Sequence, residues 1–351
     1  MSYTYHEKKV LKAQSTMKHL LTYGLVILIV GVALVVLFGL HSGSYKSNIF
    51  GGGSTSTTTT KVSSNVWVVN EGNNTVTELS SAGATLGTFS VDGNPDAIAI
   101  DPNGNVWVAS LFGDAVTKLS STGAILGIYA VGNRPGAIAI DPNGNVWVAN
   151  EYNNTVTELS SAGATLGTFS VDGYPDAIAI DPNGNVWVAS LSDSTVTKLS
   201  STGTILGTFS VGGNPISIAI DPNGNVWVVN GGGSTVTEFS NTGTTLGTFN
   251  VGINPNGIAI DSNGNVWVTS SFSERTEYIN TVTELSNTGT TLGTFNVGLN
   301  PYAIAIDSSG NVWVTNFGNN AVTKISSAGA TLGTYTVGNY PVGIAAGYIA
   351  P

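Results

Sequence analysis

The chain has 351 residues, with 11 Lys and Arg against 21 Asp and Glu, and therefore a net charge of −10. It contains no Cys, which excludes a disulfide scaffold, a thiolate zinc site and a cysteine nucleophile. Because only 9% of residues are charged and the balance is acidic, the basic surface that binding to nucleic acid requires is also missing.

An apolar run near the N-terminus is the first element along the chain. Leu20 to Leu40 comprises 21 uncharged residues, enough for a helix that crosses a bilayer core of about 30 Å. The run is preceded by the positive charges of Lys8, Lys9, Lys12 and Lys18, whereas Lys46 is the one charged residue in residues 41–60. The positive-inside rule then keeps the N-terminus cytoplasmic. We expect a single transmembrane helix over 14–41, with the rest of the chain displayed outside the cell membrane.

The start of that run carries a more specific pattern. Residues 12–31 read KAQSTMKHLLTYGLVILIVG, which resembles the class III signal peptides of archaeal type IV pilin-like proteins. The resemblance implies that a membrane peptidase cuts between Ala13 and Gln14, removing a basic leader, residues 1–13. The family pattern has Glu where this chain has Lys18, at a position that meets a neighbouring subunit in filaments. Two outcomes stay open: a minor pilin-like subunit that self-assembles, and an uncleaved anchor.

Residues 42–61 are rich in Gly, Ser and Thr and predict a flexible linker. Beyond them one unit recurs, marked by Trp67, Trp107, Trp147, Trp187, Trp227, Trp267 and Trp313. The spacing is 40 residues, except for a last interval of 46 that holds an insertion near Ser271 to Tyr278. A fixed period near 40 indicates a repeat architecture. Residues 62–351 are therefore expected to form one domain.

Each unit contains four short β segments. Around Trp107 they cover residues 97–100, 105–109, 115–119 and 125–130, and they are rich in β-branched and aromatic residues. Four strands per unit of about 40 residues are typical of a β-propeller blade. The first unit lacks its first strand, and residues 341–346 form an orphan first strand at the other end. We expect an all-β fold, a seven-bladed β-propeller closed by pairing of its N- and C-terminal segments.

The recurring motif, which reads PDAIAIDPNGNVWV from Pro95 to Val108, resembles NHL-type repeats and especially the virginiamycin B lyase family. The resemblance covers residues 62–347 and implies the seven-bladed fold. It also implies a lyase that uses His and acidic residues around Mg²⁺. The only histidines are His6, His19 and His41, so no propeller position can inherit the catalytic role. We expect no catalytic residue and no cofactor.

Three recurring features have structural interpretations. The tryptophans lie within apolar strands and are expected between blades, rather than as a stacking platform. The Asp-Pro-Asn-Gly segments, such as Asp101 to Gly104, are expected to be turns and not calcium loops, because no distal Glu follows. One strand position is charged in every unit, and we expect solvated side chains at Glu78, Lys118, Glu158, Lys198, Glu238, Glu284 and Lys324.

The copies differ from one another at one end of the blades. We call the end with the Asp-Pro-Asn-Gly and Ser-Ser-Ala-Gly types of turn the constant face, because its sequence barely changes. The opposite end, the variable face, holds the connection between the second and third strands and the segment before each first strand. Variation confined to one face is typical of binding loops on a rigid scaffold, although loops also tolerate change. Our ligand candidates are Phe112, Arg134, Tyr152, Tyr174, Tyr302, Phe317 and Tyr340.

Two further kinds of site are weaker candidates. Asp96 and Asp176 each follow a proline that begins a first strand, and could hold a cation if they converge. Asn73 and Asn153 begin Asn-x-Thr sequons and are candidates for N-glycosylation.

The function expected from these features is surface binding or adhesion by a membrane-anchored propeller, with a glycan or another surface protein as the partner. One alternative is an extracytoplasmic lyase or metal-dependent hydrolase that uses Asp and Glu. Another is a structural filament subunit.

Overall fold

The computed structural model describes residues 28–30, 33–35, 65–274 and 277–347. The chain divides into two compact units, Met1–Thr59 and Thr60–Pro351. The predicted leader of residues 1–13, the cleavage site at Ala13 and Gln14, and the linker over 42–61 all lie outside the described residues.

The first unit differs from the predicted helix over 14–41 wherever it is described. Its six described residues form β1 (Leu28–Val30) and β2 (Ala33–Val35), which pair antiparallel. β-Branched apolar residues favour strands. A lipid bilayer favours a helix over the same sequence, because every backbone N–H and C=O group must then find its hydrogen-bond partner within the segment. Among the described residues, no helix is long and apolar enough to span a membrane.

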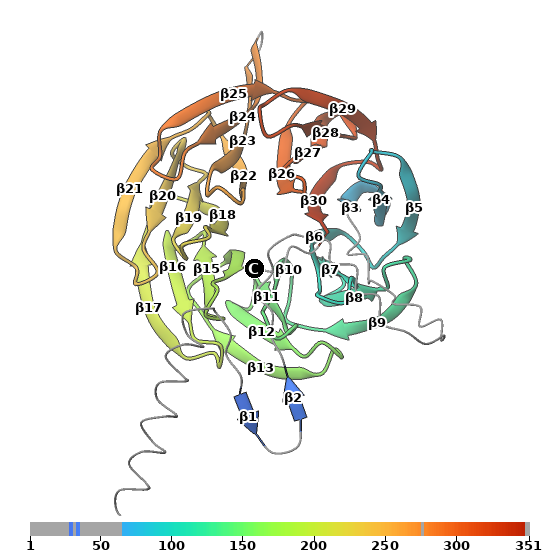
Figure 1. Cartoon of the computed structure of the whole chain (residues 1–351), viewed down its shortest axis with the longest axis vertical. Helices are drawn as coiled ribbons and strands as arrows, with labels where there is room; N and C mark the ends of the chain where they lie inside the picture. Colours follow the sequence, from blue (N-terminus) through green and yellow to red (C-terminus); the bar gives the residue numbers. More distant parts are fainter. Residues whose placement is uncertain (1–27, 31–32, 36–64, 275–276, 348–351) are drawn as a thin grey trace, which may run out of the picture. The chain divides into compact units, whose positions relative to one another are not determined.

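The second unit consists of seven four-stranded antiparallel sheets arranged as a ring (Figure 1). We number the blades 1 to 7 in the order β30-β3-β4-β5, β6–β9, β10–β13, β14–β17, β18–β21, β22–β25 and β26–β29. The predicted seven-bladed propeller of four-stranded blades is therefore confirmed.

Equivalent strands start and end at equivalent residues in the repeat. The innermost strands are β30 (Pro341–Ala346), β6 (Pro95–Ile100), β10 (Pro135–Ile140), β14 (Pro175–Ile180), β18 (Pro215–Ile220), β22 (Pro255–Ile260) and β26 (Pro301–Ile306). The second strands are β3 (Val66–Asn70), β7 (Val106–Ser110), β11 (Val146–Asn150), β15 (Val186–Ser190), β19 (Val226–Asn230), β23 (Val266–Glu274) and β27 (Val312–Asn316).

The third strands are β4 (Thr75–Leu79), β8 (Ala115–Leu119), β12 (Thr155–Leu159), β16 (Thr195–Leu199), β20 (Thr235–Phe239), β24 (Glu277–Leu285) and β28 (Ala321–Ile325). The outer strands are β5 (Thr85–Ser90), β9 (Ile125–Ala130), β13 (Thr165–Ser170), β17 (Ile205–Ser210), β21 (Thr245–Asn250), β25 (Thr291–Asn296) and β29 (Thr331–Thr336). Two short 3₁₀ turns, η1 (Glu71–Asn73) and η2 (Phe317–Asn319), follow β3 and β27.

Blade 1 closes the ring with strands from both ends of the propeller. β30 pairs antiparallel with β3, in a register that sets Trp67 opposite Ala345 and Val68 opposite Ile344. The orphan strand predicted at residues 341–346 thus supplies the innermost strand that the first unit lacks. Closure in this way leaves no open sheet edge between the first and last blades.

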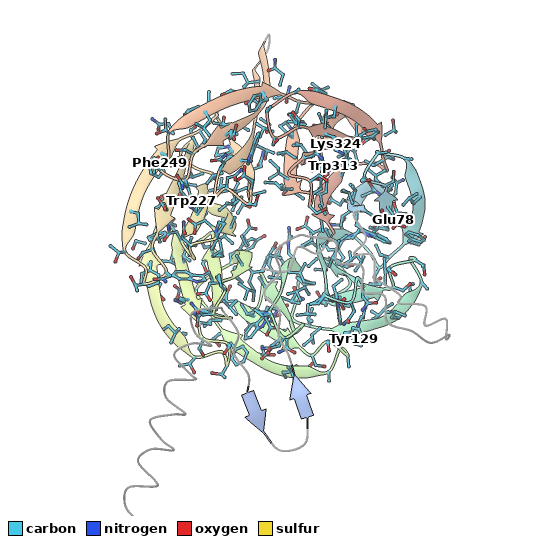
Figure 2. The ribbon with its side chains drawn as sticks, in the orientation of Figure 1. Glu78, Tyr129, Trp227, Phe249, Trp313 and Lys324 are labelled. Atoms are coloured by element: carbon cyan, nitrogen blue, oxygen red, sulfur yellow. The ribbon has the colours of Figure 1, made fainter. Side chains whose placement is uncertain are left out.

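The hydrophobic core lies between blades. Each Trp is at most 3% exposed, and Trp107 of blade 2, for example, packs in one cluster with Ile138, Val146 and Leu159 of blade 3. An aromatic ring from the outer strand of the same blade covers each Trp, as Figure 2 shows for Trp227 and Phe249, whose ring centroids are 5.4 Å apart. The inter-blade interpretation of the tryptophans is confirmed.

The constant face is held by buried aspartates. Asp101 is fully buried, and its Oδ1 accepts hydrogen bonds from the N–H groups of Asn103 and Asn105, both at 2.9 Å. Its Oδ2 accepts one from Nε1 of Trp107 at 3.1 Å. The Asp-Pro-Asn-Gly segment is therefore a turn that fastens the first strand to the Trp of the second, as predicted.

The charged position on the third strand is buried in five blades and largely covered at Lys118 and Lys198, so the prediction of solvated charges is wrong. Register places Lys118 opposite Trp107, with Nζ 4.5 Å from the ring centroid and 3.8 Å from Oδ2 of Asp101. The same Nζ donates to the carbonyl of Ser161, in a turn of the next blade, at 2.7 Å. Lys324 and Trp313 repeat the arrangement (Figure 2). The neighbouring blade covers this position, and a strand pattern within one blade does not reveal that cover.

Four blades carry Glu at the same position. Glu238 is 6% exposed, and its Oε1 accepts a hydrogen bond from Nδ2 of Asn225 at 3.1 Å. Burial and the nearby Asp221 carboxylate raise the pKa of Glu238 to about 7.

The insertion in the sixth unit lengthens a hairpin. β23 and β24 each have nine residues and stay paired from Val266 and Leu285 to Glu274 and Glu277. Blade 6 consequently extends further on the variable face than its neighbours.

Candidate functional site

The variable face is a set of paired connections, one pair per blade. In blade 3 the N–H of Glu151, after β11, donates to the carbonyl of Arg134, before β10, at 3.0 Å. In blade 1 the N–H of Glu71 donates to the carbonyl of Tyr340 at 3.0 Å. Both types of connection therefore lie at the same end of the blade, as predicted.

The residue before each innermost strand has a left-handed backbone. Its φ lies between 47° and 57° at Asn94, Arg134, Tyr174, Asn214, Asn254, Asn300 and Tyr340. Asn adopts this conformation readily, whereas other L-residues lose about 1–2 kcal/mol there. Arg134, Tyr174 and Tyr340 thus accept strain that the four Asn blades largely avoid. Strain of this kind collects at functional positions.

The first group of side chains centres on Glu151 of blade 3. Its side chain is 5% exposed and its Oε2 lies 2.5 Å from Nε of Arg134. Gly136, the second residue of β10, makes room for it, because a Cβ there would collide with Oε1 of Glu151. The other six blades carry a side chain at this strand position, so the glycine is what admits Glu151.

Asp96 and Asp176 approach Glu151 from the two adjacent blades. They occupy the same strand position as Gly136, in β6 and β14, and both of these strands contact β10. Desolvation, with the Glu151 carboxylate as the next cause, raises the pKa of each aspartate to about 7, while Arg134 opposes the rise. These carboxyls can therefore exchange protons near neutral pH.

Two tyrosines complete this group, which we call the Glu151 cluster (Asp96, Arg134, Glu151, Tyr152, Tyr174 and Asp176). Nη1 of Arg134 donates to the Tyr152 hydroxyl at 3.0 Å, and the guanidinium lies 5.1 Å from the centroid of that ring. The Tyr152 and Tyr174 centroids are 6.0 Å apart. Burial and the Glu151 carboxylate raise the pKa of Tyr174 to about 12. The Tyr174 hydroxyl therefore stays protonated as a hydrogen-bonding group across the physiological range.

A second group, the aromatic cluster, consists of Tyr302 and Phe317 of blade 7 and Tyr340 of blade 1. Phe317 and Tyr340 are stacked, with centroids 4.9 Å apart and an interplanar angle of 22°. Tyr302 continues the series at 6.4 Å from Phe317. Tyr302 is 44% exposed and Tyr340 51%, so the three rings form an accessible platform.

A pocket of about 390 Å³ adjoins the aromatic cluster, and we call it the Asn256 pocket. Its lining consists of Asn254, Asn256, Ser271, Asn300, Pro301, Tyr302 and Phe317. Nδ2 of Asn256 donates to Oγ of Ser271 at 3.2 Å and to the Pro301 carbonyl at 3.3 Å. These bonds tie the pocket wall of blade 6 to that of blade 7.

The structure brings together six of the seven predicted ligand residues in these two groups. Phe112 is the exception, because it is 76% exposed on the connection between β7 and β8 and contacts no other aromatic ring among the described residues. Glu151 and Asn256 complete the site and were not singled out as ligand residues from the sequence. The signal for Glu151 was present as Gly136, the one glycine among the second residues of the innermost strands.

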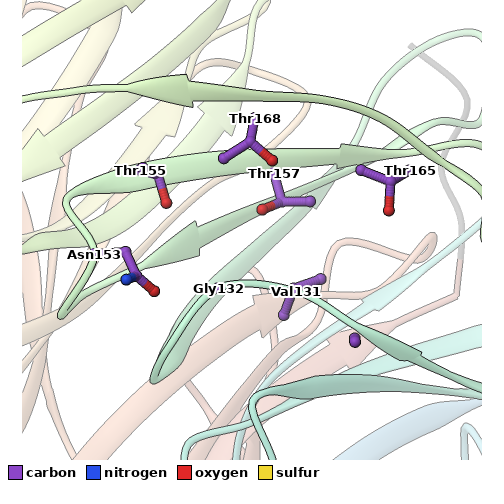
Figure 3. Close-up of a pocket in the computed structure, with 8 residues that line it drawn as sticks. Val131, Gly132, Asn153, Thr155, Thr157, Thr165 and Thr168 are labelled. Carbon is purple, nitrogen blue, oxygen red and sulfur yellow. The ribbon is translucent and has the colours of Figure 1, made fainter.

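The weaker candidates have separate outcomes. Within residues 65–274 and 277–347, no three Asp, Glu or His side chains come close enough to hold a metal ion, so Asp96, Asp176 and Glu151 do not form a metal site there. Asn73 and Asn153 are exposed, and each Oδ1 accepts a backbone hydrogen bond, from Asn339 and Asn133 respectively. Figure 3 shows Asn153 beside a threonine-lined groove of about 440 Å³ between blades 2 and 3. Glycosylation at either residue stays a prediction.

The comparisons with known proteins agree with the fold. The model of the virginiamycin B lyase family matches residues 47–289 and 168–349. A protein of unknown function from Desulfotomaculum acetoxidans is 17% identical, with a TM-score of 0.71 over 82% of this chain and 99% of its own. A streptogramin B lyase structure is 17% identical, with a TM-score of 0.63 over 71% and 86%.

A third similar structure is that of a catalytically inactive virginiamycin B lyase from Staphylococcus aureus, in which a histidine is replaced by alanine, with quinupristin. It is 17% identical, with a TM-score of 0.62 over 69% of this chain and 84% of its own. At these identities the structures establish the fold. A search of the curated proteins finds no match.

Proposed function

This chain belongs to the virginiamycin B lyase family, and we propose that it has kept the propeller as a binding scaffold without the lyase chemistry. Its function in this proposal is to bind a surface ligand through the variable face, outside the cell. The observation that carries the proposal is the contrast between a propeller without histidine and a variable face that collects aromatic and carboxyl side chains.

The missing histidines argue against inherited catalysis. The similar lyase from Staphylococcus aureus is described as inactive when one histidine becomes alanine. Residues 42–351 of this chain contain no histidine at all. A side chain that titrates near pH 7 without perturbation is therefore lacking where the family would place its acid or base.

Display at the surface is supported by the sequence before the propeller. The apolar run from Leu20 to Leu40 and the lysines ahead of it favour a membrane anchor with an extracellular propeller. The resemblance of residues 12–31 to class III signal peptides supports processing between Ala13 and Gln14. A minor pilin-like subunit would carry the propeller as its head. In the structural alternative, the chain would be a filament subunit.

An enzyme is the second candidate, and one observation favours it. Asp96 and Asp176 flank Glu151 with pKa values raised to about 7, which suits a general acid or base at neutral pH. An extracytoplasmic lyase or metal-dependent hydrolase would use these carboxyls in place of histidine.

One experiment separates the two candidates. Residues 60–351 hold all seven sheets of the closed ring, so this fragment is the reagent. Fluorescently labelled fragment is applied to cells of the source organism from which the gene has been deleted, and conversion of quinupristin with Mg²⁺ is followed by chromatography. The proposal predicts saturable binding and no conversion. Conversion that is lost in Asp96→Asn and Asp176→Asn, without any cell binding, would establish the enzyme instead.

A further inference from the structure

We propose that the Asn256 pocket and the aromatic cluster together bind one unit of an uncharged glycan. The inference rests on the proposed function, because it names the ligand class and the place on the variable face where that ligand binds. It concerns blades 6, 7 and 1 and not the Glu151 cluster.

The aromatic cluster supplies a flat apolar surface. Phe317 and Tyr340 are stacked at 4.9 Å and Tyr302 extends the surface toward the pocket, with half of the tyrosine surfaces still exposed. A pyranose ring has one face of C–H bonds, and these carry the partial positive charge that the face of an aromatic ring attracts. Exposure of this much aromatic surface to water is unfavourable, and a ligand with such a C–H face would explain it.

The backbone at Tyr340 shows that the aromatic side chain is retained against strain. Its φ is +54°, in a position where blades 2, 5, 6 and 7 have Asn. Asn would relieve the strain and would remove the stacking surface. Within the fold the Tyr340 ring contacts Phe317 and Gly72, and half of its surface stays exposed. We attribute the retained tyrosine to a ligand that covers this exposed surface.

The pocket wall supplies neutral hydrogen-bonding groups. The side-chain amides of Asn254 and Asn300 make no hydrogen bond within the described part of the chain, and Oδ1 of Asn256 accepts none there. The two hydrogen bonds to Ser271 and Pro301 fix the direction of Asn256. Amides offer both donors and acceptors, which matches the paired donor and acceptor character of sugar hydroxyls.

No charged side chain lines the pocket, so its wall offers an ionic ligand no partner of opposite charge. The seven lining residues are amide, hydroxyl, proline and aromatic, so a charged ligand would lose hydration there without gaining an ion pair. A purely apolar ligand would leave the amides of Asn254 and Asn300 and Oδ1 of Asn256 unpaired. At about 390 Å³ the volume lies in the range of small-molecule pockets and accommodates a sugar ring.

The pocket lies at the base of the hairpin that the insertion in the sixth unit lengthens. Ser271, in its wall, is the residue at which β23 continues beyond the usual length of a second strand. Within the described ring, a longer hairpin and three neighbouring aromatic rings occur together only at the junction of blades 6, 7 and 1.

The test uses fragment 60–351 on an array that holds uncharged oligosaccharides beside sialylated and sulfated ones. The key variant is Tyr340→Asn, which installs the residue that four other blades have and should fold at least as well as the parent. Its matched control is Ser194→Asn, which installs in blade 4, at another left-handed position of the variable face, the Asn that blades 1, 3 and 7 have there. Tyr174→Asn tests the Glu151 cluster as the alternative binding site. Asn256→Ala probes the pocket wall, and thermal unfolding of every variant verifies its folding.

We expect binding to at least one uncharged glycan, weakened by about tenfold or more in Tyr340→Asn and in Asn256→Ala and unchanged in Ser194→Asn. Binding only to sialylated or sulfated glycans, or binding lost in Tyr174→Asn and kept in Tyr340→Asn, would overturn the pocket assignment while the proposed function stands. Binding to the deletion cells that no glycan on the array reproduces would have the same meaning. Failure to bind cells at all would overturn the proposed function first.

Discussion

The two faces of the ring use the same kinds of residue for opposite purposes. On the constant face, both carboxylate oxygens of Asp101, Asp181 and Asp307 are occupied, because they accept hydrogen bonds from backbone N–H groups, an Asn amide and an indole, and Oδ2 lies at most 3.8 Å from Nζ of a lysine. On the variable face, Asp96 and Asp176 are left with raised pKa values and no hydrogen-bond partner among the described residues. A carboxylate that is fully hydrogen-bonded stabilises a fold, whereas one that is held without partners is available to a ligand.

Removal of an aspartate from the constant face should have the largest effect on stability. Asp181→Ala deletes two backbone hydrogen bonds and the bond from Trp187, and it leaves Lys198, 3.6 Å from Oδ2, buried without a carboxylate. We expect a loss of about 3–5 kcal/mol in the free energy of unfolding. Urea denaturation measures it. A loss below about 1 kcal/mol would mean that the turn is held by other contacts.

The ion pair of the variable face should matter next. Arg134→Asn relieves the backbone strain but leaves Glu151 buried beside Asp96 and Asp176 without its cation. We expect a loss of about 2 kcal/mol at pH 8 and a smaller one at pH 5.5, where the neighbouring aspartates are protonated. Equal losses at the two pH values would contradict the coupling among these carboxyls.

A glutamate of the constant face gives a pH dependence of known sign. Because the folded-state pKa of Glu238 is raised to about 7, the folded state binds the extra proton, and its contribution is fully present below about pH 4.5 and is lost as the pH rises through about 7. Glu238→Gln mimics the protonated form. At pH 8 we expect it to be more stable than the parent by about 1 kcal/mol, with the difference vanishing near pH 4.5. Melting temperatures across this range would reveal a difference of the wrong sign.

The carboxyl coupling can also be read without unfolding the protein. Glu151→Gln removes the negative charge that raises the pKa values of Asp96 and Asp176. We expect both pKa values to fall below about 7, measured by NMR titration of the carboxyl carbons. Asn225→Ala, on the constant face, is the control that should leave them unchanged.

The fold was predictable because the same sequence pattern recurs in seven units. The spacing of the tryptophans, the turn residues and the orphan strand at 341–346 were enough to define seven blades and their closure. The environment of Lys118 was not predictable, since its cover comes from Ser161, 43 residues away in the next blade. The strands at residues 28–30 and 33–35 were not predicted, because apolar composition alone does not distinguish a strand from a helix.

The candidate site was predictable as a face but not as two groups. Differences between copies single out Arg134, Tyr174 and Tyr340, yet they do not show that these residues share a left-handed backbone. Glu151 enters the site through the space above Gly136, and Asn256 through bonds to Ser271 and Pro301. Both depend on packing between segments that are distant in the sequence.

The most direct test of the division between the faces compares the parent fragment with Tyr340→Asn in a single pair of measurements, binding to the gene-deletion cells and thermal unfolding. The account predicts that binding to the cells is weakened by about tenfold or more while the melting temperature stays the same or rises. Unchanged binding, or binding that falls only in step with stability, would contradict the claim that the aromatic cluster of the variable face is built for a ligand.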